Sequence, residues 1–297
     1  MDTRWVLVVL TVLLLIKTTT SSANEIWISQ IGDNLDLEIT QQGENNGGGI
    51  AIVGDDNTIT QTQIGVNNTV GPINSNDTVV GDRNILTWFQ DGQYHQFEGA
   101  LTGSDNKLDS YQGGSGESNF ARVMVDGDGN DVTIYQGKKV DGTTDTTEGG
   151  DHEAYVTITG DSNTFESYQT DESTFCCSNR NHLADIITGS SNTVVHDQRG
   201  NGAHQGFIEV TGDSNDIDVL QSGGQGDHFY DLILSGDNNS VTSLQNGDGG
   251  HSMTLDLTNN GGAYNVNTTQ DSTTNQSYSL IGVCTNISGC AISVTQN

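Results

Sequence analysis

The chain has 297 residues, of which 39 are Asp or Glu and only 9 are Lys or Arg, so its formal net charge at neutral pH is −30. Such an acidic chain repels nucleic acids and anionic membranes, which argues against both as partners. Apolar residues make up 32% of the chain, too few for an ordinary globular core of this length, and 38 residues are Gly. The composition therefore indicates either a disordered chain or a repeat protein.

The first residues have the pattern of a signal peptide. An apolar stretch over residues 6–16 follows a basic residue and precedes a run of small polar residues. The stretch is too short to span a bilayer, and small residues stand at the positions that a signal peptidase reads before Ala23. We expect residues 1–23 to be removed, which leaves a secreted mature chain, residues 24–297, without a membrane anchor. The alternative is an anchor that stays attached.

A short pattern recurs along the mature chain: Gly-x-x-Asn, with Gln six residues after the Asn. The Asn residues of its eight complete copies are Asn57, Asn84, Asn106, Asn130, Asn163, Asn192, Asn215 and Asn239. Three degenerate copies bring the number of units to eleven. The Gln residues of the eleven units are Gln41, Gln63, Gln90, Gln112, Gln136, Gln169, Gln198, Gln221, Gln245, Gln270 and Gln296.

Polar and apolar residues alternate on both sides of each turn Gly, which is typical of half-buried strands. The residue two before the Gly and the residue four before the Gln are apolar in every unit, except that Gln30 stands in the first unit. Each unit is therefore predicted to be a strand, a tight turn in which Gly adopts a positive φ, and a second strand. One unit cannot bury its own inner face, so the units must stack. We predict an all-β fold, a single β-solenoid of about eleven strand-turn-strand coils stacked in parallel.

The unit resembles the curlin repeat, whose pattern is Ser-x5-Gln-x-Gly-x2-Asn-x-Ala-x3-Gln, over almost the whole mature chain. The match is best at the start, where Gln30, Gly32 and Gln41 follow the family pattern. In later units an apolar residue replaces the Gln before the Gly, and a large apolar residue replaces the Ala. The chain is therefore similar to the curlins as a divergent relative.

The resemblance implies a structural subunit of extracellular, curli-like amyloid fibres of a cell-surface or biofilm matrix, with a role in adhesion. Such a subunit polymerises by end-to-end stacking, because its terminal coils expose unpaired strand edges. Its main partner would be itself, with a nucleator subunit and secretion or chaperone machinery as further partners. The alternative is a secreted acidic solenoid that acts as an adhesin or a calcium-binding surface protein and does not itself polymerise.

Enzymatic activity is not expected. Some parallel β-helices modify polysaccharides, and they usually need clustered Asp with Arg or Lys on one exposed face. Two of the nine Lys and Arg residues lie in the signal segment, so the mature chain keeps seven, which are scattered along its turns and connectors.

Identical amides stacked one per coil can hydrogen-bond along the stack, so we predict a structural Gln ladder and a structural Asn ladder. The Asn residues also have a local explanation, because Asn suits the exit of a turn.

A further polar column stands eight residues before each turn Gly: Asn24, Asn46, Ile73, His95, Asn119, His152, Asn181, His204, His228, His251 and Thr274. Its phase predicts inward side chains, and we expect neutral imidazoles that hydrogen-bond to the neighbouring Gln amides. The alternatives are half-hydrated residues at the start of a strand and a zinc or copper site.

Calcium is the one cofactor that the sequence suggests. Asp126, Asp128, Asn130 and Asp131 form the densest group of oxygen ligands, and stacked turn carboxylates repel one another unless a cation bridges them. The alternative is a row of solvated carboxylates that keeps fibres apart.

Four Cys residues in a secreted chain suggest disulfides. Cys284 and Cys290 flank the widened turn of the last unit and are predicted to pair. For Cys176 and Cys177 the sequence leaves three options open: a bridge to each other, a bridge to another subunit, or free thiols.

Overall fold

The computed structural model describes residues 24–71, 78–114, 118–137, 152–170, 181–182, 184–223, 226–257, 263–282 and 288–297. The predicted signal peptide, together with Cys176, Cys177 and Cys284, lies outside these ranges. In the ranges described, no helix is long and apolar enough to cross a membrane.

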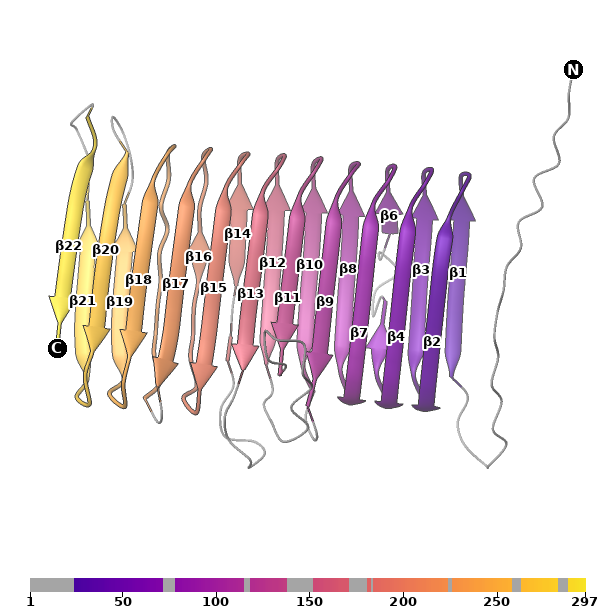
Figure 1. Ribbon diagram of the computed structural model, residues 1–297, viewed down its shortest axis with the longest axis horizontal. Helices are drawn as coiled ribbons and strands as arrows, with labels where there is room; N and C mark the ends of the chain where they lie inside the picture. Colours follow the sequence, from indigo (N-terminus) through magenta and orange to yellow (C-terminus); the bar gives the residue numbers. More distant parts are fainter. Residues whose placement is uncertain are drawn as a thin grey trace, which may run out of the picture.

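The described strands form two flat layers that face each other along a rod (Figure 1). One layer is a nine-stranded sheet, continued toward the C-terminal end by isolated bridges from His182 to Ser252 and by a two-stranded sheet. The other is a single eleven-stranded sheet. We call them the first and the second layer.

The first layer contains β1 (Glu25–Ile31), β3 (Gly47–Val53), β5 (Thr69–Val70), β6 (Thr78–Val80), β8 (Gln96–Thr102), β10 (Phe120–Asp126), β12 (Glu153–Thr159), β14 (Asp185–Thr188), β16 (Ile208–Glu209), β19 (His251–Asp256) and β21 (Gln276–Ile281). The second layer contains β2 (Asp36–Glu44), β4 (Thr58–Val66), β7 (Ile85–Gln93), β9 (Lys107–Gly113), β11 (Asp131–Gln136), β13 (Thr164–Thr170), β15 (Thr193–Gly200), β17 (Asp216–Gly223), β18 (Ser240–Asn246), β20 (Tyr264–Asp271) and β22 (Cys290–Gln296).

The chain alternates between the layers, and each strand pairs in parallel with the strand one coil away. The prediction of an all-β solenoid is confirmed, and the eleven strands of the second layer correspond to the eleven repeat units.

The core lies between the layers and consists of the two predicted apolar columns with additional inward residues. Ile59, Val132 and Phe165 of the second layer are fully buried, and so is Ile158 of the first. Each apolar residue contacts its equivalent in the next coil, as Val132 does with Phe165 in the register of β11 and β13. Stacking therefore buries what a single coil cannot bury alone.

The third coil differs from our alignment. Asn68, not Ile73, occupies the inward polar position, because Thr69 pairs with Gly47 on one side and Gln96 on the other. Residues 72–77, which include Ile73, follow β5 in the sequence and lie outside the described ranges. Our alignment counted back from the turn Gly without allowing for an insertion inside a strand.

The last coil also differs from our alignment. His251 pairs with Gln276 instead of Thr274, and Leu280 pairs with Leu255, two residues from the expected place. Thr274 stands in the column only when Gly282 is counted as the turn Gly, but the N–H of Gly282 donates to Asp256 O, so Gly282 continues the strand pairing.

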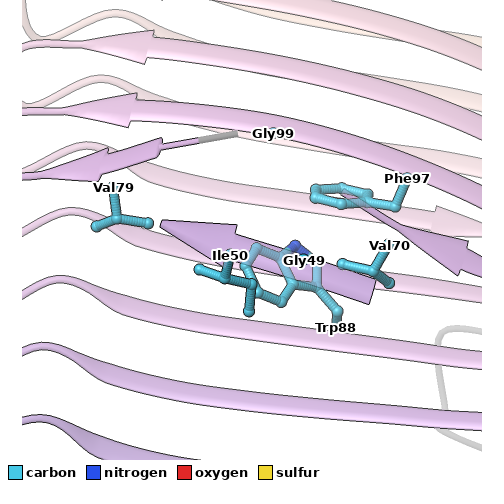
Figure 2. Close-up of a pocket in the computed structure, with 7 residues that line it drawn as sticks. All are labelled: Gly49, Ile50, Val70, Val79, Trp88, Phe97 and Gly99. Carbon is cyan, nitrogen blue, oxygen red and sulfur yellow. The ribbon is translucent and has the colours of Figure 1, made fainter. Parts of the chain in front are cut away.

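A small cavity of about 10 Å³ lies in the core near the N-terminal end, between Trp88, Phe97 and the inner faces of Gly49 and Gly99 (Figure 2). Gly99 stands in register with the buried Val123, and the ring of Phe97 occupies the place of a side chain there, since a Cβ atom at Gly99 would lie 2.9 Å from Phe97 Cε1. The tilted rings of Trp88 and Phe97, 5.5 Å apart, fill only part of it. A space of this size holds one water molecule at most and cannot serve as a ligand pocket.

The turn glycines are set by close contact between coils. Gly103 has a φ of +123°, and a Cβ atom there would lie 1.9 Å from the carbonyl oxygen of Gly127 in the next coil. Both the backbone conformation and the space therefore require Gly.

We predict that Gly103→Ala lowers the free energy of unfolding by about 3 kcal/mol, because the backbone is strained and the stacked turn must move. Gly47→Ala is the matched control, since a Cβ atom at Gly47 meets nothing within 4 Å, and it should change stability by less than about 0.5 kcal/mol. Urea unfolding of the two variants measures both effects. Equal destabilisation would contradict the assignment of the turn contact.

Candidate functional site

The Gln side chains form an unbroken ladder through the interior. At each of ten steps from Gln41 to Gln296, the Nε2 atom donates to Oε1 of the Gln in the next coil, over 2.7–3.1 Å. The second N–H of the same amide donates across the core to a carbonyl of the first layer, as from Gln136 to Phe120 O at 2.8 Å. Each Gln thus joins its coil to the next coil and one layer to the other.

The Asn side chains also bond between coils. The Oδ1 atom of Asn57 accepts the backbone N–H of Asn84 at 2.9 Å, and Nδ2 of Asn57 donates to the carbonyl of the next turn Gly, Gly81, at 2.8 Å. The same pair of bonds recurs along the column, and at its far end Asn239 accepts the N–H of Tyr264 at 2.7 Å. The Asn residues therefore satisfy buried backbone groups at the turn exit of the neighbouring coil.

The Asn and His residues at the opposite edge of the core perform the same task, and the structure places all five predicted His residues there. Asn46 Oδ1 accepts the N–H of Asn68 at 3.0 Å, and His228 Nδ1 accepts the N–H of His251 at 3.3 Å. His228 Nε2 lies 3.0 Å from Ser222 O. These partners assign the neutral tautomer with the proton on Nε2, in which an imidazole has the same donor and acceptor pattern as an Asn amide.

The rings of His204, His228 and His251 are stacked, with centroids 4.8 and 4.9 Å apart and planes within 8°. We had expected these rings to bond to the Gln amides, and this was wrong: their ring nitrogens contact backbone groups. The narrow core places the Gln amides against the first-layer carbonyls, while the imidazoles reach the backbone at the chain reversal.

Burial lowers the pKa of three His residues in this column. Burial lowers the pKa of His95 to about 4, although a backbone hydrogen bond to Asp91 opposes the shift. Burial also lowers the pKa of His228 to about 4, and the adjacent rings of His204 and His251 add to the effect, while Asp227 opposes it. The pKa of His204 is lowered as well, again chiefly by burial.

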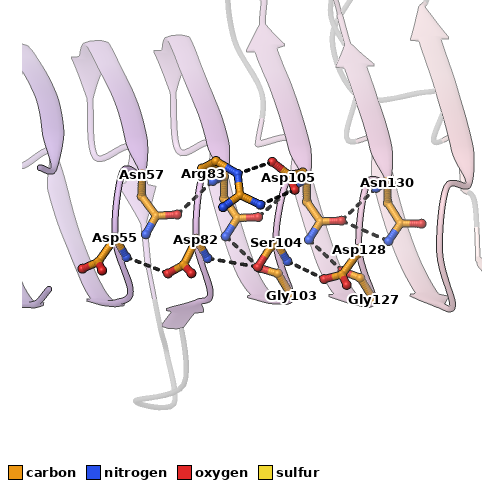
Figure 3. Close-up of polar contacts among 12 residues, drawn as sticks. Asp55, Asn57, Asp82, Arg83, Gly103, Ser104, Asp105, Gly127, Asp128 and Asn130 are labelled. Carbon is orange, nitrogen blue, oxygen red and sulfur yellow. Dashed lines mark hydrogen bonds and ion pairs between the residues drawn. The ribbon is translucent and has the colours of Figure 1, made fainter. Parts of the chain in front are cut away.

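The turn carboxylates form a third row, seen beside the Asn ladder in Figure 3. Asp82 Oδ1 accepts the N–H of Asp55 at 2.8 Å, and Asp128 Oδ1 accepts that of Ser104 at 2.7 Å. Between them, Ser104 Oγ accepts the N–H of Asp82 at 3.3 Å. An oxygen at this position therefore caps the turn of the preceding coil, which explains why Asp or Ser stands there.

One of the four predicted calcium ligands, Asn130, is not available to a cation. Asn130 is buried, and its Oδ1 and Nδ2 atoms are both engaged in the Asn ladder and at Gly160 O. Asp128 uses Oδ1 on the neighbouring turn, which leaves Asp126 and Asp131 on either side of that turn. Within the described ranges, no three His, Cys, Asp or Glu residues lie close enough to hold a metal ion.

Cys290, at the start of β22, is disulfide-bonded. Its predicted partner, Cys284, lies outside the described residues, as do Cys176 and Cys177, so the predicted pairing stays a prediction.

The structure also contains a buried ionisable pair and an outer column of aromatic rings, which were not predicted. Asp185 and His196 face each other inside the core, with Asp185 Oδ1 3.7 Å from His196 Nδ1. Asp185 stands four residues before the turn Gly189, a place whose phase is inward, so the period-two pattern contained the signal.

We predict that replacing His204, His228 and His251 together by Asn preserves the fold and flattens the dependence of stability on pH. The folded-state pKa of His228 is depressed, so its contribution is present above the unfolded value of about 6.5 and is lost as pH falls toward 4. Between pH 7 and 5 the loss should be about 2 kcal/mol for His228 alone. Urea unfolding at both pH values tests this, and an equally steep profile in the variant would contradict it.

Comparison with known proteins agrees with this arrangement. Residues 32–65, from the first turn through the end of the second coil, match the family model described as the Curlin associated repeat. No curated protein sequence matches the chain. The matched segment contains Gln41, Asn57 and Gln63, the residues from which both amide ladders start. Over these residues, the chain is similar to the curlin repeat.

Proposed function

We propose that the chain is the structural subunit of an extracellular, curli-like fibre in which copies stack end to end. The observation that carries the proposal is the unsatisfied state of the Gln ladder at its ends. Gln41 Oε1 is buried and has no hydrogen-bond partner among the residues that the structure describes. At the other end, Gln296 Nε2 donates to Ser277 O at 3.3 Å and has no further Gln to bond. The two ends are complementary, because one lacks a donor and the other lacks an acceptor.

The apolar columns end in the same way. Leu37 and Ile292, the first and last members of the second-layer column, are only partly buried, whereas Ile59 and Val241 within the column are 0% and 1% exposed. A second copy that places its first coil on the last coil would cover both residues. It would also continue the parallel strand pairing, because β2 and β22 each have one neighbour in their sheet.

The family relationship supports the same proposal, since the curlin-repeat family is structural and not enzymatic. An extracellular site agrees with the net charge of −30, because salt outside the cell screens the repulsion between stacked copies. The partner is thus a second copy of the chain, with a nucleator and secretion machinery as further proposed partners.

We predict that the mature chain forms filaments visible by electron microscopy, and that Gln41→Leu slows their growth about tenfold or more. The variant removes the buried acceptor, and an unmade hydrogen bond of this kind is worth about 1–3 kcal/mol. Thr40→Val, on the same strand with its side chain pointing outward, is the matched control. Short rods that stay monomeric at high concentration would favour the alternative, an adhesin that does not polymerise.

We also predict that calcium accelerates assembly more than sodium chloride at the same ionic strength. Each capping Asp uses one carboxylate oxygen and leaves the other for a bridging cation. Seeded growth followed by light scattering compares the two salts, and addition of a chelator should reverse the difference. If both salts accelerate growth equally, calcium acts only by screening the negative charges and does not bind at a specific site.

A further inference from the structure

A column of aromatic rings stands on the outer face of the second layer. Phe89, Tyr111, Tyr135 and Tyr168 are register partners on β7, β9, β11 and β13. The rings of Tyr111 and Tyr135 are stacked with centroids 4.8 Å apart, and those of Tyr135 and Tyr168 are 5.2 Å apart. The planes in these two pairs lie within 10° and 4° of parallel. We call the three Tyr residues the tyrosine ladder.

The rings of the tyrosine ladder are neither buried nor free to move apart. All three side chains are partly exposed, so a peroxidase can take a hydrogen atom from them at the protein surface. Their strands are paired in parallel, so the register holds each phenol beside the next. Two reactive groups held in this way react as though at very high concentration.

One phenol of the ladder also has a proton acceptor. The hydroxyl of Tyr168 donates to Glu166 Oε2 at 2.9 Å. Burial, followed by the hydrogen bond to Glu166, raises the pKa of Tyr168 to about 12, so the phenol is protonated at neutral pH. Removal of an electron from such a phenol requires the departure of its proton, and Glu166 is in place to accept it.

We propose that the tyrosine ladder is a site of oxidative cross-linking, in which hydrogen peroxide and a haem peroxidase join Tyr135 to Tyr168 or to Tyr111. Each of two phenols loses one hydrogen atom to the peroxidase. The two radicals form a carbon–carbon bond between ring positions next to the hydroxyls, and the hydrogen atoms on those carbons move to the phenol oxygens. One peroxide is reduced to two waters, which accounts for the two hydrogen atoms lost.

The coupling takes place inside one copy of the chain and does not depend on fibre formation. Its product is a covalent bond between neighbouring coils of the same sheet. The bond closes a loop of the chain and therefore restricts the unfolded state, so the linked protein should unfold at a higher temperature than the unlinked protein.

The experiment treats dilute mature protein with a haem peroxidase and hydrogen peroxide and measures dityrosine fluorescence. Digestion and mass spectrometry then identify linked peptides, which have lost two hydrogen atoms. We expect the Tyr135–Tyr168 pair to dominate, with a yield independent of protein concentration. Tyr135→Phe should remove most of the signal and preserve the stack, because Phe89 already stands in the same column.

Two further variants separate this site from general oxidation. Tyr94 is 52% exposed and outside the column, so Tyr94→Phe should leave the yield unchanged. Glu166→Gln should reduce the Tyr135–Tyr168 product several-fold and leave the Tyr111–Tyr135 product in place. The proposal is overturned if Tyr135→Phe couples like the parent chain, if Tyr94 dominates the linked peptides, or if the yield rises with protein concentration.

Discussion

The stack depends on the way in which each Gln amide uses its two N–H groups. One N–H bonds along the rod to the next coil and the other bonds across the core to the facing layer, as at Gln136. A strand that slipped by one residue would turn its Gln to the solvent and its apolar residues with it, so both bonds and the core would be lost together. The amide therefore selects the register that all the other columns share. Asn is one methylene shorter, which is why the two amides do not exchange places between the columns.

The remaining polar columns solve the problem of chain reversal in a very thin core. Each coil brings buried backbone groups to both edges of the core, where strand pairing cannot satisfy them. Asn57 and its equivalents bond these groups at the turn exit, turn oxygens such as Asp82 cap the turn itself, and Asn46 or His228 act at the opposite edge. Amide and carboxylate side chains satisfy the backbone groups at both edges, so only the thin space between the layers has to be apolar. An apolar content of 32% is therefore enough for a continuous core. The same residues explain the acidic, Asn-rich and Gln-rich composition.

Repeat spacing predicted the second layer correctly in every coil, from Leu37 beside Ile59 to Val266 beside Ile292, because the inner apolar residue stands four residues before the Gln in every unit. It failed in the first layer of the third and the last coil, where the inward polar residue does not stand eight residues before the Gly from which it is counted. The pattern placed the His column inside but could not say which groups its rings would meet. Tyr111, Tyr135 and Tyr168 each stand directly before a repeat Gln, so the Gln spacing already contained their alignment on the outer face. The compartment, the disulfide pairing and polymerisation stay predictions.

The Gln ladder has a direction, since every step from Gln41 to Gln296 donates the same way along the chain. Each side-chain amide is a dipole, and here the dipoles add instead of cancelling. The rod is therefore polar along its axis, and this dipole grows with every copy added in register. Two such rods lying side by side have lower electrostatic energy when they run in opposite directions. Bundles that form by lateral contact should therefore contain both orientations and present chemically equivalent ends.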